Sequence, residues 1–481
     1  MARIRIGLAL CVALMLTQSL TAQSLRYKMI DLGTLGGPNS AEGVTVPVIS
    51  DQGVVIGGSD TAFLDPNCVF PPNCLDLHAF RWRDGTITDL GTLPGGNNSL
   101  AYSINARGQI VGLAENGTFD FFANSPVTRA ALWQNGHVAD LGDFGGRNGF
   151  ANAINNRGQV AGGVQNAVND PFFGNQVRAF LWEKGVLQDL GTLGGPDAAA
   201  DHVNSRGEVA GTSFVNLTPA CGDIPSLNGQ PGAGVATVHA FLWRESTMQD
   251  LETLGGSCSY EFGLNDRGQV AGDSALLGDQ TAHPFRWEFG KMIDLGTLGG
   301  SWGHVFGING KGDVIGTSAL PGDFLHHAFF WRDGMTDLGT IDGDPCSDAH
   351  GINIRDQVVG SSTDCGGDEG ELHGFVWQPK GPMIDLNAFV PPDSDLTITD
   401  GQTINDRGEI AASGMMPNGD FHAVLLIPCG ATASPGDRCR DAMETRSRRV
   451  FVHSQGAQRR LLKQRLGMWN SRSSSLLPWV R

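Results

Sequence analysis

Three short phrases recur in a fixed order along almost the whole chain, and this internal repeat limits the fold more than any other feature of the sequence. The first phrase is Asp-Leu-Gly-Thr-Leu-Gly-Gly or a variant, the second is Ile-Asn-x-Arg-Gly-x-Val-x-Gly, and the third is His-Ala-Phe-Leu-Trp. The first phrase begins at Asp31, Asp89, Asp140, Asp189, Asp250, Asp294, Asp337 and Asp385, so the repeats are 43 to 61 residues long. A period of this length is typical of solenoids, propellers and arrays of small units.

Each unit is predicted to form four short strands. The first strand ends at the Ile-Asn pair, where Asn-x-x-Gly favours a tight turn because Asn caps its own turn and Gly accepts a positive φ. The second strand is Gln109–Gly112 and its equivalents, the third is the apolar Ala-Phe-Leu-Trp segment, and the fourth leads into Asp-Leu-Gly. Short strands punctuated by many of the 68 glycines argue against helices and for a sheet protein.

The two ends of the repeat region complement each other. The chain starts with a lone fourth strand, Tyr27–Leu32, and finishes with three strands that lack a fourth, namely Thr403–Asn405, Glu409–Ser413 and His422–Ile427. Pairing these segments completes an eighth blade and protects both open sheet edges, whereas an open solenoid needs polar caps. We therefore predict an all-β fold, an eight-bladed β-propeller of four-stranded blades, in which the N-terminal strand pairs with the last three strands.

The combination of phrases resembles the HAF-repeat family of extracellular bacterial proteins, named for the His-Ala-Phe phrase that stands here at 78–80 and 239–241. The resemblance covers about residues 27–428. It implies export and a structural repeat, and it implies no reaction. The chain departs from the family phrase at Arg129, at Arg178 and in the last unit, Val424–Leu426.

The predicted domain organisation has four parts. Residues 1–22 are typical of a signal peptide, because Arg3 and Arg5 precede a short apolar run that is not long enough to span a bilayer. Residues 23–428 form the propeller, residues 429–439 a linker, and residues 440–481 a basic, disordered tail. This organisation predicts a secreted protein without a transmembrane segment, in the periplasm, at the cell surface or outside the cell.

Charge is divided unevenly between the tail and the rest of the chain. Residues 440–481 hold ten of the 33 Lys and Arg but only two of the 50 Asp and Glu, so the body is strongly acidic. An acidic body disfavours nucleic acid as a partner, since phosphate binding needs clustered cations. We expect a monomer.

Eight cysteines remain once the signal peptide is removed, and an even number in an exported protein favours disulfides over metal sites. We predict the pairs Cys68–Cys74, Cys221–Cys258, Cys346–Cys365 and Cys429–Cys439. Six of these cysteines are expected in loops on one face of the ring.

The repeated Trp, Asp and His residues are interpreted as structural. Trp beside an apolar strand indicates core between blades, and Asp at a strand end indicates a hydrogen-bond acceptor. One His per blade does not supply the converging ligands of a metal site. Oxygen-rich loops of one unit can hold calcium, with the candidate ligands Asp342, Asp344, Asp364, Asp368 and Glu369. No other cofactor and no catalytic residue is predicted, and the sequence contains no HExxH motif.

Long and variable loops are expected on one face of the ring, at 59–77, 113–128, 163–177 and 213–238. Variation on one face of a fixed scaffold is where binding is usually found. We therefore expect a secreted binding or interaction module for an extracellular protein or glycan. The alternative is a propeller enzyme acting on extracellular glycans at the propeller mouth. A cluster of polar residues from several blades would distinguish the two, and the sequence alone does not reveal one.

Overall fold

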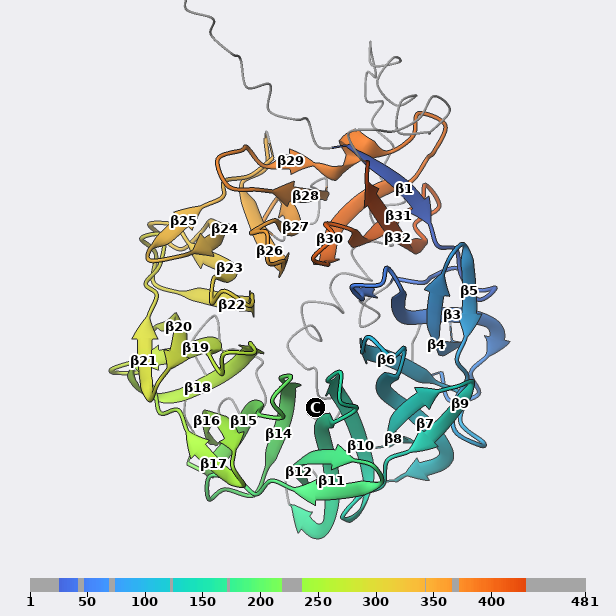
Figure 1. Ribbon diagram of the computed structural model, residues 1–481, viewed down its shortest axis with the longest axis vertical. Coiled ribbons are helices and arrows are strands. Elements are labelled where there is room, and N and C mark those ends of the chain that lie inside the picture. Colours follow the sequence, from blue (N-terminus) through green and yellow to red (C-terminus); the bar gives the residue numbers. More distant parts are fainter. Residues whose placement is uncertain are drawn as a thin grey trace, which may run out of the picture.

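The computed structural model describes residues 26–41, 47–68, 74–121, 124–170, 174–218, 236–341, 343–365 and 372–429. These residues form eight four-stranded antiparallel sheets arranged in a ring (Figure 1). The predicted eight-bladed β-propeller is therefore confirmed. Within these ranges the helical content is one short 3-10 helix, η1 (Leu386–Phe389), and no helix there could cross a membrane. The expected signal peptide and basic tail lie outside the described residues.

Seven blades each use four consecutive strands, and the strand nearest the ring axis comes first in each (Figure 1). Blades 1 to 4 consist of β2 (Val48–Ile49), β3 (Val55–Leu64), β4 (Leu75–Arg83) and β5 (Thr86–Asp89); β6 (Ser99–Ile104), β7 (Ile110–Asp120), β8 (Ser125–Gln134) and β9 (His137–Asp140); β10 (Gly145–Ile154), β11 (Val160–Asp170), β12 (Gly174–Glu183) and β13 (Val186–Asp189); and β14 (Ala198–Val203), β15 (Val209–Asn216), β16 (Thr237–Arg244) and β17 (Thr247–Asp250).

Blades 5 to 7 follow the same order. They consist of β18 (Gly255–Leu264), β19 (Val270–Leu276), β20 (Ala282–Glu288) and β21 (Lys291–Asp294); β22 (Gly303–Ile308), β23 (Val314–Ala319), β24 (His326–Trp331) and β25 (Met335–Asp337); and β26 (Cys346–Ile352), β27 (Val358–Thr363), β28 (His373–Trp377) and β29 (Ile384–Asp385).

Blade 8 closes the ring from both ends of the chain. It consists of β30 (Thr397–Ile404), β31 (Ile410–Met415) and β32 (Phe421–Pro428), with β1 (Tyr27–Asp31) as its fourth strand. Strand β1 runs antiparallel to β32, from Tyr27 opposite Pro428 to Asp31 opposite Val424. The predicted pairing of the N-terminal strand with the last three strands is therefore confirmed.

The core lies between neighbouring blades, as the repeated Trp and Phe residues indicate. Trp133 of blade 2 belongs to the same cluster of buried side chains as Ile56 and Ala79 of blade 1. The Phe of the third phrase is fully buried in six blades, at Phe80, Phe180, Phe241, Phe285, Phe329 and Phe375. Apolar side chains at a fixed place in every blade thus hold each sheet against the next.

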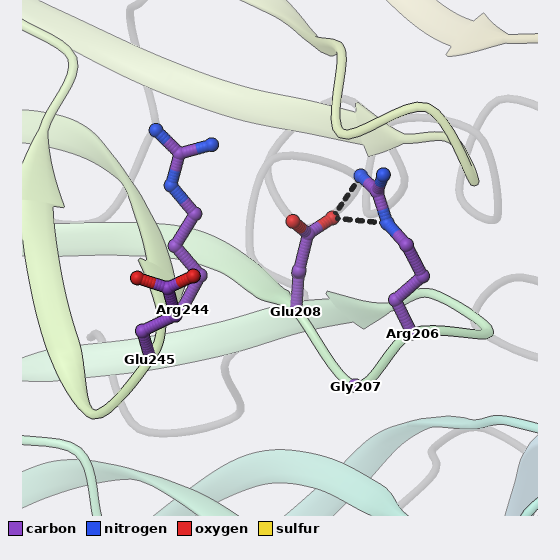
Figure 2. Close-up of a pocket in the computed structure, with 5 residues that line it drawn as sticks. All are labelled: Arg206, Gly207, Glu208, Arg244 and Glu245. Atoms are coloured by element: carbon purple, nitrogen blue, oxygen red, sulfur yellow. Dashed lines mark hydrogen bonds and ion pairs between the residues drawn. The ribbon is translucent and has the colours of Figure 1, made fainter.

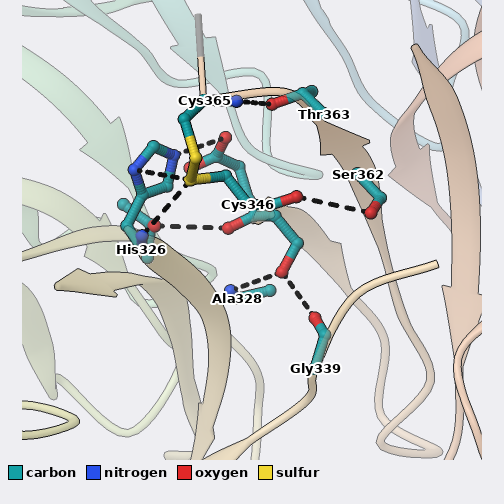
Figure 3. Close-up of a disulfide and its surroundings, with 10 residues drawn as sticks. His326, Ala328, Gly339, Cys346, Ser362, Thr363 and Cys365 are labelled. Carbon is teal, nitrogen blue, oxygen red and sulfur yellow. Dashed lines mark hydrogen bonds and ion pairs between the residues drawn. A yellow bond between two sulfur atoms is a disulfide. The ribbon is translucent and has the colours of Figure 1, made fainter. Parts of the chain in front are cut away.

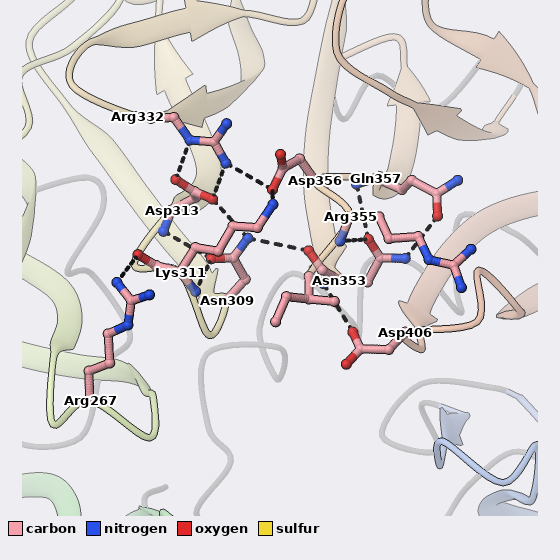
Figure 4. A network of polar contacts seen from close by, with 11 residues as sticks. Arg267, Asn309, Lys311, Asp313, Arg332, Asn353, Arg355, Asp356, Gln357 and Asp406 are labelled. Atoms are coloured by element: carbon pink, nitrogen blue, oxygen red, sulfur yellow. Dashed lines mark hydrogen bonds and ion pairs between the residues drawn. The ribbon is translucent and has the colours of Figure 1, made fainter.

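The Asn of the second phrase links the blades to one another (Figure 4). Its side-chain oxygen accepts from two backbone N–H groups of its own turn, as expected, while its Nδ2 donates to the backbone carbonyl at the equivalent position of the next blade. Seven residues make this bond: Asn105, Asn155, Asn204, Asn265, Asn309, Asn353 and Asn405. The last bond joins Asn405 to the Ser50 carbonyl of blade 1, at 2.9 Å. We call this set the asparagine belt.

In five blades the His of the third phrase pairs with the Asp of the first phrase, whereas in blade 7 His373 pairs with Asp344. These outer pairs are His78–Asp89, His239–Asp250, His283–Asp294, His327–Asp337 and His422–Asp31, with nitrogen–oxygen distances of 2.8 to 2.9 Å. Arg129 and Arg178, where the chain departs from the family phrase, pair with Asp140 and Asp189 in the same way. The Asp is thus a hydrogen-bond acceptor at the end of a strand, as expected. The sequence analysis did not predict that its partner is the His of the third phrase.

Two of the predicted disulfides are confirmed, Cys68–Cys74 and Cys346–Cys365. Cys258 and Cys429 are also disulfide-bonded, and their expected partners, Cys221 and Cys439, lie outside the described residues. The expectation of loop positions is wrong for Cys258, which lies within β18, and for Cys346, which begins β26. In blade 7 the disulfide lies beside His326 (Figure 3), whose Nδ1 is 3.5 Å from the Cys346 sulfur.

Candidate functional site

The innermost strands carry a β-bulge at the same place in seven blades. The register of each strand shifts by one residue three positions before the Asn of the second phrase. The bulged residues are Tyr102, Asn152, Asp201, Phe262, Phe306, His350 and Gln402. Bulges re-aim side chains and are frequent beside functional sites. A repeated backbone feature therefore carries a side chain that differs from blade to blade.

Contacts between these bulged residues and their neighbours run without interruption from blade 3 to blade 5. The Asn152 amide donates to the Asp201 carboxylate at 2.9 Å. The next residue, His202, places Nδ1 2.9 Å from Glu261 of blade 5. Glu261 directly precedes the bulged Phe262.

The contacts then continue to blade 8 through aromatic rings. Phe262 lies edge-to-face with His304, His304 with Phe306, and Phe306 with His350, at ring-centroid distances of 4.6, 4.7 and 4.9 Å. The Asp400 carboxylate lies 2.9 Å from His350 Nδ1 and also accepts from Gln402. We call the whole set the inner arc: Asn152, Asp201, His202, Glu261, Phe262, His304, Phe306, His350, Asp400 and Gln402.

The imidazoles of the inner arc are the exposed members of their ion pairs. The side chain of His202 is 41% exposed while that of its partner Glu261 is 0% exposed, and His304 is 19% exposed over a fully buried Asp273. In the outer pairs the order is reversed, with 18% for His78 and 46% for Asp89. The outer pairs thus expose their carboxylate to solvent, whereas the inner pairs expose their imidazole.

Electrostatic contacts shift the pKa values of several inner-arc groups. Burial, reinforced by the nearby Glu261 carboxylate, raises the pKa of Asp201 to about 7. Desolvation opposes the charged form of His202, but the neighbouring Glu261 outweighs it and raises the pKa of His202 to about 9. Burial likewise opposes the charge of His350, and the carboxylates of Asp400 and Asp348 raise its pKa nevertheless. His202 is therefore a cation at neutral pH.

The predicted calcium ligands are not tested by the structure. Asp342, Asp368 and Glu369 lie outside the described residues. The carboxylate of Asp344 accepts from His373 at 2.9 Å, and Asp364 directly precedes Cys365 of the disulfide. Among the described side chains, no group of three or more His, Cys, Asp or Glu is arranged to hold a metal ion.

A cavity of about 440 Å³ lies between two short turns of blade 4 (Figure 2). It is lined by Arg206, Gly207, Glu208, Arg244 and Glu245, from the β14–β15 and β16–β17 turns. Arg206 is bonded to Glu208, and Arg244 donates to Gln249 and lies over the ring of Trp287. Three of the four charged groups that line the cavity, Arg206, Glu208 and Arg244, are therefore engaged within the scaffold.

No family model matches the chain, and no curated protein matches it. Among solved structures, it is similar to the β-propeller domain of the Trilobed protease from Pyrococcus furiosus, with 7% identity and a TM-score of 0.42 over 73% of this chain and 97% of that one.

Two further solved structures resemble the chain. An acylaminoacyl peptidase from Pyrococcus horikoshii has 9% identity and a TM-score of 0.39, over 71% of this chain and 52% of the peptidase; the chain thus spans about half of the peptidase's length. A sialidase from Trypanosoma rangeli has 10% identity and a TM-score of 0.33, over 83% of this chain and 59% of the sialidase. With scores this low, the fold assignment rests on the strand pairing described above.

The inner arc was not found from the sequence. Its signal was present, because the residue three positions before the repeated Asn changes its chemical type, while the residues on either side of it are small or apolar except for His202 and Glu261. Alternation along a strand assigns residues to faces, but a bulge moves one residue out of that alternation. Only the paired register identifies these residues as a set.

Proposed function

We propose that the chain is an exported propeller of the HAF-repeat type that acts as a binding module, with its ligand held at the inner arc. Export is supported by the disulfides, since such bonds form and persist in oxidising compartments. The ligand is an extracellular glycan or protein.

One observation carries this proposal. Most of the repeated polar residues are occupied in holding the ring together, through the asparagine belt and the outer pairs. The inner arc is different, because polar and aromatic side chains from six consecutive blades meet there at positions that the repeat leaves variable. Such a convergence of a few polar groups with aromatic rings is typical of ligand sites.

The burial of Glu261 favours binding over catalysis. Asp201 and Glu261 come from adjacent blades, and their charges interact. A glycosidase needs two carboxyl groups that reach the substrate, but the side chain of Glu261 is 0% exposed and is covered by His202. The pair of Asp201 and Glu261 therefore does not supply the two accessible carboxyl groups that the alternative of a glycan-cleaving enzyme requires.

A binding screen with a paired variant tests the proposal. The full mature chain would be applied to glycan and extracellular-protein arrays, together with Phe306→Ala and with Phe289→Ala as a control. Phe306 lies in the inner arc, whereas Phe289 is 95% exposed in the β20–β21 turn. We expect Phe306→Ala to weaken binding of any ligand at least tenfold and Phe289→Ala to leave it unchanged. Equal binding by both variants would place the site elsewhere.

A further inference from the structure

We propose that the inner arc recognises an acidic sugar, a pyranose ring that carries a carboxylate, through its exposed imidazoles and Phe306. This inference rests on the proposed function and adds the chemical class of the ligand.

The first argument is the orientation of the imidazoles. His202, His304 and His350 each direct Nδ1 to a carboxylate, at 2.9, 2.5 and 2.9 Å. An ionised carboxylate only accepts hydrogen bonds, so Nδ1 carries a proton in each ring. Nε2 is then the remaining functional atom of these side chains, and no group in the described ranges bonds to it.

The second argument is the difference in burial within these pairs. The carboxylates of Glu261 and Asp273 have 0% exposure and that of Asp400 has 10%, while their imidazoles are 16 to 41% exposed. A ligand at the inner arc therefore meets the imidazole edge before the carboxylate behind it. Protonated Nε2–H groups make charge-assisted hydrogen bonds with an anion.

The third argument is the aromatic ring between two of these imidazoles. Phe306 is 38% exposed, and its ring centroid lies 4.7 Å from that of His304 and 4.9 Å from that of His350. Contacts on both sides hold the three rings as one unit. An apolar sugar face that packs on Phe306 brings a carboxylate on the same sugar within reach of an imidazole.

The short distance between the Phe306 ring and the two imidazoles favours an acidic sugar over an acidic peptide. In an acidic sugar, one rigid ring carries both the apolar face and the anion, whereas Asp and Glu side chains of a peptide have an anion without such a ring. The acidic body of the chain also repels anions in general, so an anionic ligand must be held by specific donors.

The groups that face these imidazoles make the expected affinity pH-dependent. His202 faces Glu261 and Asp201, and His350 faces Asp400 and Asp348. Asp201, whose pKa is about 7, is neutral and a donor at lower pH and becomes an anion above it. Affinity for an anion should therefore fall as the pH rises through 7, and fall again through about 9, as His202 loses its proton.

Calorimetric titration of the full mature chain tests the inference. The probes are trigalacturonate, the matching neutral trigalactoside and triglutamate, each at pH 6 and at pH 10. We expect trigalacturonate at pH 6 to bind at least tenfold more tightly than either other probe, and at least tenfold more tightly than at pH 10. Phe306→Leu, which keeps the apolar bulk, and His350→Gln should each weaken it at least tenfold.

His239→Gln is the matched control, since His239 belongs to an outer pair whose carboxylate is the more exposed partner. It should bind trigalacturonate as the unaltered chain does, and the unfolding temperature of each variant identifies any that fails to fold. Equal affinity for the neutral probe or for triglutamate, or no binding of trigalacturonate, would overturn the acidic-sugar assignment. In those cases a ligand from the arrays that is sensitive to Phe306→Ala would still support the proposed function.

Discussion

The asparagine belt makes a quantitative prediction at Asn353. This side chain is 2% exposed and makes four hydrogen bonds. Its Nδ2 donates to the Gln357 side chain at 2.9 Å and to the Asn405 carbonyl at 3.0 Å, and its Oδ1 accepts from the backbone N–H groups of Arg355 and Gln357. Asn353→Ala removes all four bonds at a site that water does not reach.

A typical intramolecular hydrogen bond contributes about 1 kcal/mol, so the loss should be about 4 kcal/mol. Blade 1 offers a natural reference, because Ser50 stands at the equivalent position and its side chain accepts only from the Val54 N–H, at 3.2 Å. Asn353→Ser should therefore keep one acceptor and lose less, about 2 to 3 kcal/mol by the same reasoning.

Urea unfolding followed by tryptophan fluorescence measures these changes, because the repeated Trp residues lie in the core between blades. The expected order of unfolding midpoints is the unaltered chain, then Asn353→Ser, then Asn353→Ala. Asn418→Ala is a suitable control, since Asn418 lies in an exposed turn and exchanges hydrogen bonds only with Asp420, two residues further along the chain. If Asn353→Ala unfolds at the same urea concentration as Asn418→Ala, the belt does not stabilise the ring.

Two further changes test how the ring is closed. Ser50→Asn should complete the belt by adding the eighth inter-blade bond, to the Asn105 carbonyl, and should raise stability by about 1 kcal/mol in the same urea assay; an unchanged or lower midpoint would contradict this. Asp31→Asn removes the outer pair of the closing blade and should lower the unfolding temperature more than Asp89→Asn does, because no tight turn joins β1 to β32. Burial alone would raise the pKa of Asp31, but hydrogen bonds from His422 and Gly33 lower it, and the bond to Asp31 raises the pKa of His422. The stabilisation of the fold by the Asp31 carboxylate is complete above its unfolded pKa of 3.8 and is lost as the pH falls through its lowered folded pKa. The stabilisation by protonated His422 is complete below its unfolded pKa of 6.5 and is lost as the pH rises through its raised folded pKa. Differential scanning calorimetry should therefore show the largest effect of Asp31→Asn between about pH 4 and 6.5, and an effect that does not vary with pH would refute the ion pair.

The sequence predicted the parts of this fold that depend on local pattern. Strand number and order follow from the three phrases, and ring closure follows from counting one strand at the start and three at the end. The confirmed pairing of the N-terminal strand with β32 required no more information than that. The buried Trp133 was likewise indicated by its place beside an apolar strand.

The bonds that were missed join residues from different phrases or different blades. His78 and Asp89 are eleven positions apart in the chain, and a pattern search treats their two phrases as separate motifs. Asn204 reaches a carbonyl 61 positions away. A repeat reveals that a residue is needed in every blade, but it does not reveal which neighbouring blade provides its partner.

His and carboxylate pairs thus occur at two radii of the ring, and their exposure separates scaffold from candidate site. In an outer pair the carboxylate needs only a cation beside it, which explains why Arg129 and Arg178 replace His in blades 2 and 3 without loss of the pair. In an inner pair the carboxylate is buried and fixes Nδ1 of an exposed imidazole, as Glu261 does for His202. An arginine there would satisfy the buried charge but would remove the exposed imidazole Nε2 that we propose as a donor to the ligand. If the inner arc binds as proposed, replacing an inner His by Arg should therefore abolish binding, whereas the same replacement in an outer pair should not.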